Sequence, residues 1–221
     1  MKNKVEVDLA AYDLSLATEM YAKDSDTGEY KLYQTLYDGE NRILLTSDQI
    51  PQSLRDAAVA IEDKRFYKHK GVDWYRTTGA FINMFLSMKN DFGGSTITQQ
   101  LAKNLFPRDT VRNRGRLVRN AKLVTSKLKE WITALKLEYN YTKEEIAAMY
   151  LNTVEYGSNA YGIKSAALTF FNKEPHELNV QEAAVLVGVV NAPSRYSPVR
   201  NYDNALARRN LVISRMEDAG A

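Results

Sequence analysis

Apolar residues recur at the three- and four-residue spacing of amphipathic helices through most of the chain after residue 50. This spacing predicts helices over 53–66, 74–88, 95–106, 123–139, 146–152 and 183–190, and a last helix that begins at residue 203. Asp73 is a candidate N-cap for the second of these helices, and Ser95 opens the third. The pattern therefore predicts a mainly α fold beyond residue 50.

Two pairs of polar residues mark where later helices begin. Thr142 with Glu145, and Asn179 with Glu182, have the spacing of a capping box, in which each side chain bonds to the other residue's backbone N–H. Residues 108–119 are polar and basic, and they predict a loop ahead of the helix at 123–139.

The first 50 residues have a different character, because they are polar and rich in tyrosine. Within them, the segment 29–46 alternates loosely around Asp38 and Gly39, which predicts a hairpin or a strand pair. We therefore divide the chain into an N-terminal linker with a short β element, residues 1–50, and a helical domain, residues 51–221.

The amino-acid composition argues against several kinds of cysteine and histidine chemistry. The 221 residues include no cysteine and only two histidines, His69 and His176, which argues against disulfides, a thiol nucleophile and a multi-histidine zinc site. The net charge of +3 is too small to indicate a partner. No stretch has the length of a transmembrane helix, and the N-terminus lacks the apolar core of a signal peptide. Both a soluble cytoplasmic protein and an excised domain fit these observations.

Glu62 is the first candidate for catalysis, because it borders the apolar run that precedes it. Partial desolvation of a carboxylate raises its pKa toward that of a useful general base. Acidic residues are nevertheless common at helix ends, so the position alone is weak evidence. His69 is more simply interpreted as a structural residue that closes this segment.

A second candidate is the polar segment 93–104. Two glycines, at positions 93 and 94, allow close approach of the backbone to a ligand. Five hydrogen-bonding side chains follow, and Lys103 lies four residues beyond Gln99, on the same helical face. The five are Ser95, Thr96, Thr98, Gln99 and Gln100. A hydroxyl-rich or phosphate-bearing ligand suits this group, and a capped surface helix explains it equally well.

Basic residues crowd the region that follows, at positions 108, 112, 114, 116, 119, 122, 127 and 129. Such a run is usually a solvated face, and it also suits an acidic membrane or nucleic acid. Nucleic acid is the weaker alternative, because the run has no interleaved aromatic residues. Glu130 follows Lys127 by three residues, and the simplest interpretation of that spacing is an ion pair within one helix.

Taken together, these segments resemble the family 51 glycosyltransferases, the peptidoglycan-polymerising domains of class A penicillin-binding proteins. Five blocks match in family order and span about residues 43–216. They are 62–66 with His69 and Gly71, 93–100 with Lys103 and Asn104, 127–130, 143–152 with Tyr156 and Gly157, and 182–193 with 208–210. One departure is Ser126, which stands where the family usually has arginine.

The resemblance implies a fold like that of phage lysozyme, with a helical head lobe and a smaller apolar jaw lobe that faces the membrane. The apolar run 80–88 suits the jaw, and its alternative interpretation is a plain core helix. The predicted fold class is thus mainly α, with head and jaw lobes and a short N-terminal β element. Residues 51–221 would form the glycosyltransferase domain.

The resemblance also implies a reaction, in which lipid II is joined into β-1,4-linked glycan strands with inversion and release of undecaprenyl pyrophosphate. Glu62 would be the general base, and Glu130 a second catalytic carboxylate that orients the cations and the donor or holds a divalent ion. Mg²⁺ or Mn²⁺ is the cofactor that the family resemblance allows. The expected substrate-binding residues are Ser95, Gln99, Gln100, Lys103, Arg112, Arg114, Lys127 and Asn152.

The expected partners are lipid II, the growing glycan strand and the membrane surface, without nucleic acid. Members of the family normally carry a transmembrane anchor, and class A members also carry a C-terminal transpeptidase. We therefore expect an excised domain that acts at the outer, periplasmic face of the bacterial inner membrane. Two rival functions stay open: a lysozyme-like hydrolase, and a non-catalytic scaffold or nucleic-acid-binding module.

Overall fold

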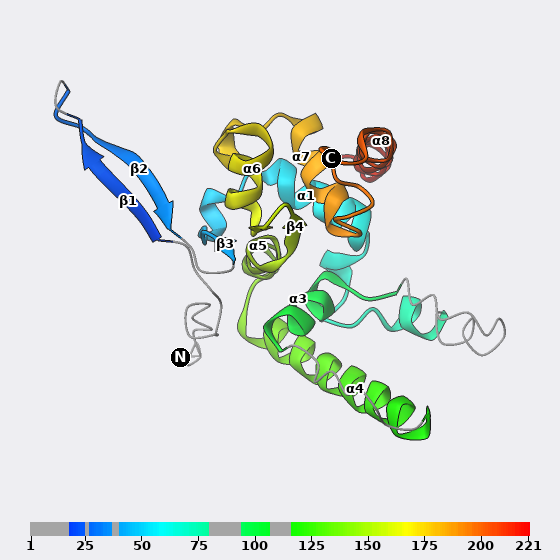
Figure 1. Cartoon of the computed structure of the whole chain (residues 1–221). Helices are drawn as coiled ribbons and strands as arrows, with labels where there is room; N and C mark the ends of the chain where they lie inside the picture. The colour runs from blue at the N-terminus through cyan, green and yellow to red at the C-terminus, as the bar shows by residue number, and fades with distance from the viewer. Residues whose placement is uncertain (1–17, 25–26, 37–39, 80–93, 107–115) are drawn as a thin grey trace.

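The computed structural model describes residues 18–24, 27–36, 40–79, 94–106 and 116–221. Figure 1 shows a helical body, from which a two-stranded hairpin projects on one side and a long helix, α4, extends on another. The helices are α1 (Gln52–Glu62), α3 (Ile97–Leu105), α4 (Arg116–Asn140), α5 (Lys143–Thr153), α6 (Ile163–Phe171), α7 (Val180–Val190) and α8 (Tyr202–Ala219). Short 3₁₀ helices lie at Ser47–Gln49, Phe66–Lys68 and Pro175–Glu177. The prediction of a mainly α fold is confirmed.

The apolar core gathers buried side chains from α1, α3, α5, α6, α7 and α8. Helix α5 is buried on nearly all sides from Ile146 to Thr153, which explains why its apolar pattern runs without interruption. Helix α7 packs against both α8 and α1, and α3 packs against α4 and α5. Glu62, the last residue of α1, is therefore carried on a helix held by the core.

Local capping signals in the sequence were correct at three helices. Thr142 and Asn179 form the capping boxes that start α5 and α7, as predicted. Asp73 Oδ1 accepts hydrogen bonds from the backbone N–H groups of Tyr75 and Arg76, at 3.1 and 3.2 Å, and so caps the helix that begins at residue 74. Such caps depend on residues close in sequence, so they can be predicted without knowledge of the fold.

Two predicted helix starts need correction. The cap of α3 is Thr96 and not Ser95, because Thr96 forms a capping box with Gln99. Helix α4 begins at Arg116, so the predicted loop 108–119 ends earlier and the helix starts before residue 123. Arginine and lysine favour helix, and no glycine or proline follows Gly115 in this stretch, so its basic character was not evidence for a loop.

The predicted pairing of strands on either side of Asp38 and Gly39 is also wrong. Strand β2 (Tyr30–Leu36) pairs antiparallel with β1 (Thr18–Lys23), which precedes it. The connection uses Gly28 at φ +72°, and Asp24 Oδ1 accepts a hydrogen bond from the N–H of Thr27 at 2.9 Å. Strand β3 (Asn41–Arg42) instead pairs with β5 (Ala160–Tyr161), and β5 pairs with β4 (Glu155–Gly157). Alternation indicated strands, but it could not choose between partners on either side.

Residues 40–50 pack onto the helical body. The side chain of Asn152 donates to the carbonyl of Leu45 at 2.7 Å and accepts from its N–H at 3.1 Å. Arg42 is buried, and its guanidinium donates to the carbonyl of Asn152 at 2.8 Å. These contacts fix the entry to α1, while the division of the chain at residue 50 stays a prediction.

Gly71 offers a direct test of this packing. Its φ is +87°, and an added Cβ would lie 2.7 Å from the carbonyl oxygen of Ala134 in α4. We expect Gly71→Ala to lower the free energy of unfolding by at least about 2 kcal/mol, because the left-handed backbone and the clash both oppose a side chain. Urea denaturation measures the effect. Gly79→Ala is the control, since nothing lies within 4 Å of its added Cβ and it lies in a helix. An equal loss of unfolding free energy in the two variants would contradict the close packing of Gly71 against Ala134.

Candidate active site

Glu62 lies at the end of α1 with only 10% of its side chain exposed. Its Oε2 accepts a hydrogen bond from the side-chain amide of Gln100 in α3 at 3.0 Å. The amide oxygen of Gln100 in turn accepts from the hydroxyl of Tyr150 in α5 at 3.2 Å. Oε1 of Glu62 is buried, and among the described residues it has no hydrogen-bond partner. Oε2 is thus held by Gln100, and Oε1 has a lone pair that could accept a proton.

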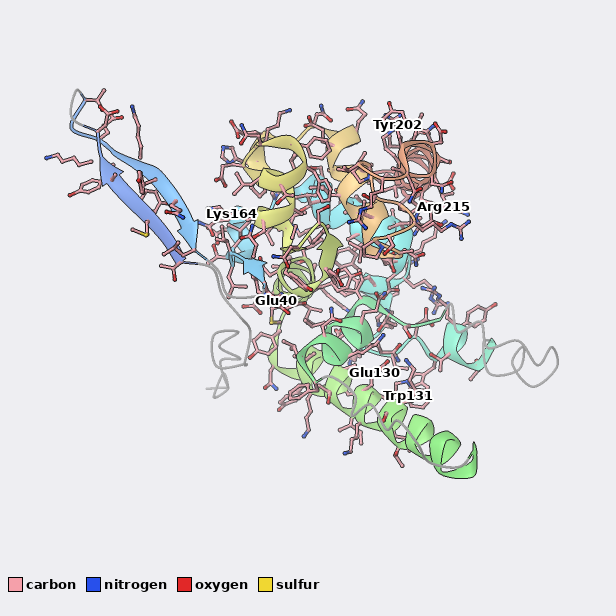
Figure 2. The ribbon with its side chains drawn as sticks, in the orientation of Figure 1. Glu40, Glu130, Trp131, Lys164, Tyr202 and Arg215 are labelled. Atoms are coloured by element: carbon pink, nitrogen blue, oxygen red, sulfur yellow. The ribbon has the colours of Figure 1, made fainter. Side chains whose placement is uncertain are left out.

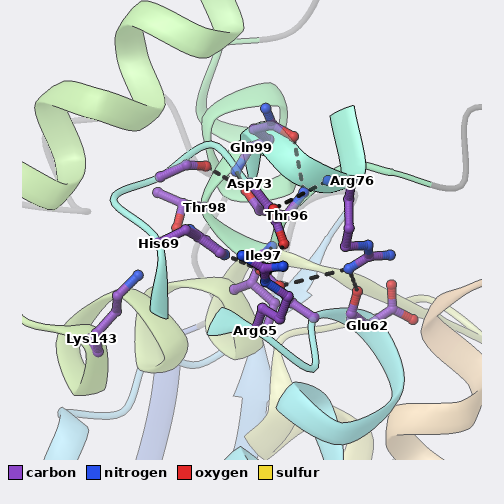
Figure 3. Close-up of polar contacts among 12 residues, drawn as sticks. Glu62, Arg65, His69, Asp73, Arg76, Thr96, Ile97, Thr98, Gln99 and Lys143 are labelled. Atoms are coloured by element: carbon purple, nitrogen blue, oxygen red, sulfur yellow. Dashed lines mark hydrogen bonds and ion pairs between the residues drawn. The ribbon is translucent and has the colours of Figure 1, made fainter. Parts of the chain in front are cut away.

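Two arginines contact Glu62, one at its carboxylate and one at its main-chain carbonyl. Nη2 of Arg208 in α8 lies 3.8 Å from Oε1 of Glu62. Nη1 of Arg76 donates to the main-chain carbonyl of Glu62 at 3.3 Å, as Figure 3 shows, and lies 3.7 Å from Oδ1 of Asp63. An added Cβ at Gly188 would lie 3.0 Å from Cγ of Arg208, so the glycine lets the arginine side chain pass over α7. Arg208 therefore faces the carboxylate of Glu62, whereas Arg76 holds its main-chain carbonyl and pairs with Asp63.

Asp63 joins the first sequence block to the second. It is fully buried, and its Oδ2 accepts from Nε2 of His69 at 2.9 Å and from the backbone N–H of Ile97 at 3.1 Å. The hydroxyl of Thr96 donates to the carbonyl of Gly71 at 2.6 Å, which adds a second tie between the same segments. These bonds explain how Gln100 is brought to Glu62. They also support a structural role for His69.

The polar residues of the second block take different roles. Gln99 is buried, and its side chain completes the capping box with Thr96. Gln100 faces Glu62, as described above. The hydroxyl of Ser95 accepts from Nζ of Lys127 in α4 at 3.0 Å. Substrate contacts by Ser95, Gln99 and Gln100 stay predictions, and for Gln99 the buried cap is the role that the structure describes.

Lys127 and Glu130 form the ion pair that their spacing indicated, within α4. Glu130 is buried, with 6% of the residue exposed, and Figure 2 shows it beside Trp131. The ring of Trp131 stacks edge to face on Trp74 at a centroid distance of 5.5 Å. Because Lys127 also bonds to Ser95, this part of α4 is tied to the loop before α3. A catalytic role for Glu130 stays a prediction.

The remaining predicted residues are placed as follows. Lys103 is exposed in the last turn of α3, one helical turn beyond Gln99 and Gln100. Asn152 is buried, and both ends of its amide bond to Leu45, so its described role is to hold the chain that enters α1. Arg112 and Arg114 lie outside the described residues, as does the apolar run 80–88.

The possible divalent ion raises the question of which side chains could bind it. Within the described ranges, no group of three or more histidine, cysteine, aspartate or glutamate side chains could hold a metal ion. Glu130, the carboxylate suggested for this task, is paired with Lys127. A divalent ion stays a prediction of the family resemblance, and we derive no step through a metal.

Three neighbours of Glu62 were not singled out from the sequence: Arg76, Tyr150 and Arg208. Tyr150 and Arg208 fall inside the family blocks 143–152 and 208–210, which gave them no individual role. Arg76 falls in the helix capped by Asp73 and lay outside every block. Only the folded structure shows that these three residues lie near Glu62.

A largely buried glutamate, with one carboxylate oxygen that has no hydrogen-bond partner among the described residues, has an arrangement that suits a general base. The transglycosylase family model matches residues 29–217, and the chain therefore belongs to this family, the family 51 glycosyltransferases. Penicillin-binding protein 1F of Bacillus subtilis is 40% identical over 82% of this chain and 24% of its own length. Penicillin-binding protein 1A of Escherichia coli is 40% identical over 83% of this chain and 20% of its own length.

The chain thus spans about a quarter or less of these curated relatives. Among solved structures, it matches a crystal structure of penicillin-binding protein 1A from Haemophilus influenzae, with a TM-score of 0.43 and 22% identity. That match covers 92% of this chain and 18% of the other. Among the described residues, no helix combines the length and the apolar character needed to cross a membrane.

Proposed function

We propose that this domain polymerises lipid II into β-1,4-linked glycan strands, with inversion at the donor sugar and release of undecaprenyl pyrophosphate. The observation that carries the proposal is the largely buried carboxylate of Glu62, in which Oε2 is hydrogen-bonded to Gln100 and Oε1 has no hydrogen-bond partner among the described residues. Membership of the transglycosylase family and relatives named penicillin-binding proteins support peptidoglycan as the substrate class.

In the proposed reaction, the 4-hydroxyl of the acceptor N-acetylglucosamine attacks the anomeric carbon of the donor N-acetylmuramic acid. Oε1 of Glu62 takes the hydroxyl proton as the new C–O bond forms. The bond from the anomeric carbon to the pyrophosphate oxygen breaks, and the electron pair leaves with that oxygen. A single displacement of this kind inverts the anomeric centre, and it needs a base on the side of the nucleophile.

The departing pyrophosphate needs positive charge on the opposite side. Lys103 is exposed one turn beyond Gln100, and the basic segment with Arg112 and Arg114 follows it in sequence. We propose that these cations bind the pyrophosphate. Glu130 holds Lys127, and Lys127 holds Ser95, so this unit would orient the donor beside the cations.

The lipid of the proposed substrate would hold the domain at a membrane. We propose that it acts at the outer face of the bacterial inner membrane, as part of a parent protein that supplies the anchor and a transpeptidase. The chain covers about a quarter of relatives named penicillin-binding proteins, which supports this arrangement.

A lysozyme-like hydrolase is the second candidate, because it would also use a buried glutamate. Cleavage of finished strands releases no pyrophosphate, so it leaves the exposed Lys103 and the basic segment unexplained. The two functions are separated by incubating the protein with labelled lipid II and, in parallel, with finished peptidoglycan. The proposal requires polymer from lipid II and intact strands in the second reaction. Shortened strands without any polymer would establish the hydrolase instead.

An exposed apolar stripe on α4 supports contact with lipid. Leu128, Ile132, Leu135 and Tyr139 lie at spacings of four, three and four residues, so they share one helical face, and they are 46%, 55%, 43% and 74% exposed. Lys129 and Lys136 are exposed on the same helix, and their charge suits anionic lipid headgroups. Figure 1 shows α4 extending away from the rest of the helical body.

We expect the double substitution Ile132→Ser with Leu135→Ser to weaken binding to anionic lipid vesicles about tenfold or more, because two partly inserted side chains are lost. The melting temperature should change little, since both side chains are already exposed in the free protein. Vesicle co-sedimentation measures the binding.

A matched control is Val180→Ser with Leu211→Ser, two side chains of similar exposure on α7 and α8. This control should leave vesicle binding unchanged. A large fall in melting temperature with unchanged vesicle binding in the α4 variant would show that the stripe packs within the protein.

A further inference from the structure

We propose that Tyr150 is a positioning residue for the general base: its hydroxyl fixes the side-chain amide of Gln100, and that amide holds Glu62 as an ionised acceptor with Oε1 unbonded. The inference rests on the proposed role of Glu62 and assigns it two supporting residues. It also gives Gln100 a task other than the substrate contact that the sequence suggested.

The three side chains come from three helices and form one chain of hydrogen bonds. Tyr150 in α5 donates to Oε1 of Gln100 at 3.2 Å, and Nε2 of Gln100 in α3 donates to Oε2 of Glu62 at 3.0 Å. Tyr150 is 1% exposed and lies in the core. A buried hydroxyl without an acceptor is costly, so the bond to Gln100 is a strong constraint.

This bond decides which way the amide of Gln100 faces. If the amide were reversed, its oxygen would face Oε2 of Glu62, and two acceptors would meet unless the carboxyl group carried a proton. Its nitrogen would then face Tyr150, whose hydroxyl proton would lose its acceptor. In the observed orientation, Nε2 of Gln100 donates to a carboxylate oxygen, whereas in the reversed orientation only a carboxyl O–H could donate to the amide oxygen.

Tyr150 stays a donor across the working range of pH. Burial raises the pKa of its phenol well above the usual 10, and the negative charge of Glu62 raises it further. The hydroxyl consequently keeps its proton wherever the enzyme is active. The hydrogen bond from Tyr150 to Gln100 is therefore kept over this pH range.

Other charged groups face Glu62 from the elements around it, and they must be kept constant in a test. Arg208 in α8 lies 3.8 Å from Oε1, and Arg76 bonds to the main-chain carbonyl at 3.3 Å. Asp63, the next residue, is engaged with His69 and Arg76. Replacing the hydroxyl of Tyr150 alters none of these groups, so a change in titration can be attributed to the chain through Gln100.

Tyr150→Phe removes the hydroxyl and keeps the ring. The amide of Gln100 can then reverse, and a protonated Glu62 becomes more accessible. The acidic limb of the pH–rate profile should therefore move to higher pH by about 0.5–1 unit, while turnover on the alkaline side of the limb is largely kept. A merely structural role would lower the rate by one factor at every pH and leave the limb in place.

Tyr156→Phe is the matched control. Tyr156 is also fully buried, and its hydroxyl donates to the main-chain carbonyl of Leu151 at 3.2 Å. It loses a buried phenol hydroxyl in the same way, so any effect of that loss on stability appears in both variants. Only Tyr150→Phe should move the acidic limb.

A second readout does not depend on turnover. In the 221-residue chain labelled with ¹³C at the glutamate carboxyl carbons, the signal of Glu62 is identified by its loss in Glu62→Gln. Its titration midpoint should rise by about 0.5–1 unit in Tyr150→Phe and stay in place in Tyr156→Phe. Because no lipid II is needed, this measurement stands even if the wild-type protein makes no polymer, which would overturn the proposed function instead.

Gln100→Met completes the test, because it removes the donor to Glu62 directly. By itself, Gln100→Met should raise the titration midpoint of Glu62. The double variant with Tyr150→Phe should have the same midpoint as Gln100→Met. If Tyr150→Phe fails to fold, Gln100→Met still decides between the outcomes. A midpoint unchanged in Gln100→Met, or a folded Tyr150→Phe protein with the wild-type midpoint, would overturn the proposal.

Discussion

Glu62→Gln is expected to reduce polymerisation of lipid II by about 10²–10⁴-fold, the usual effect of removing a general base. The amide keeps the shape of the carboxyl group but cannot accept the acceptor's proton at neutral pH. Gln100 can still bond to the amide oxygen of the new side chain, so the helices α1 and α3 should stay together. The rate is measured with labelled lipid II, and the fold is checked by thermal melting.

The control for this substitution is Glu217→Gln, which makes the same change at an exposed position of α8. It should polymerise at the wild-type rate. A folded Glu62→Gln protein that polymerises within a few-fold of wild type would remove Glu62 from the role of base, whatever the other residues do.

Lys103→Met is expected to have the second-largest effect. If Lys103 meets the pyrophosphate, its charge matters most in the transition state, where negative charge builds on the leaving oxygen. Turnover should fall by about 10²-fold or more. The affinity for moenomycin, an inhibitor whose phosphate mimics that group, should fall in the same variant. Steady-state kinetics and inhibitor titration measure the two effects.

Two comparisons sharpen the test of Lys103. Single substitutions of Arg112 and Arg114 should give smaller losses, because several arginines in that segment can replace one another. Lys68→Met, at an exposed lysine of the 3₁₀ helix Phe66–Lys68, should change neither quantity. If Lys103→Met also leaves turnover and moenomycin binding intact, Lys103 is a solvated surface residue and the donor site lies elsewhere.

The parts of the fold that could be predicted from the sequence depend on neighbours along the chain. The caps at Thr142 and Asn179 were predicted because each box closes within three residues. Strand pairing was not, since β3 pairs with β5 from the far part of the chain and β2 pairs with a strand that had not been recognised. Pairing between distant strands is decided by tertiary packing, which alternation does not encode.

The candidate site shows the same limit. Glu62 and Gln100 were chosen separately from local chemistry and family resemblance, but their contact spans 38 residues, and the contact from Tyr150 to Gln100 spans 50. Asn152 shows the limit in another way: it was predicted as a substrate-binding residue, and its amide bonds to the backbone of Leu45, while a substrate contact stays a prediction. A buried polar side chain needs partners, and the sequence does not say whether the protein or a ligand supplies them.

Polymer formation from lipid II tests the central claim most directly. The wild-type chain, mixed with labelled lipid II and lipid vesicles, should give a ladder of glycan strands on a gel. Moenomycin should abolish this ladder when added before the substrate. A folded, vesicle-bound protein that leaves lipid II as a single unreacted band, or a ladder that persists at saturating moenomycin, would contradict the account.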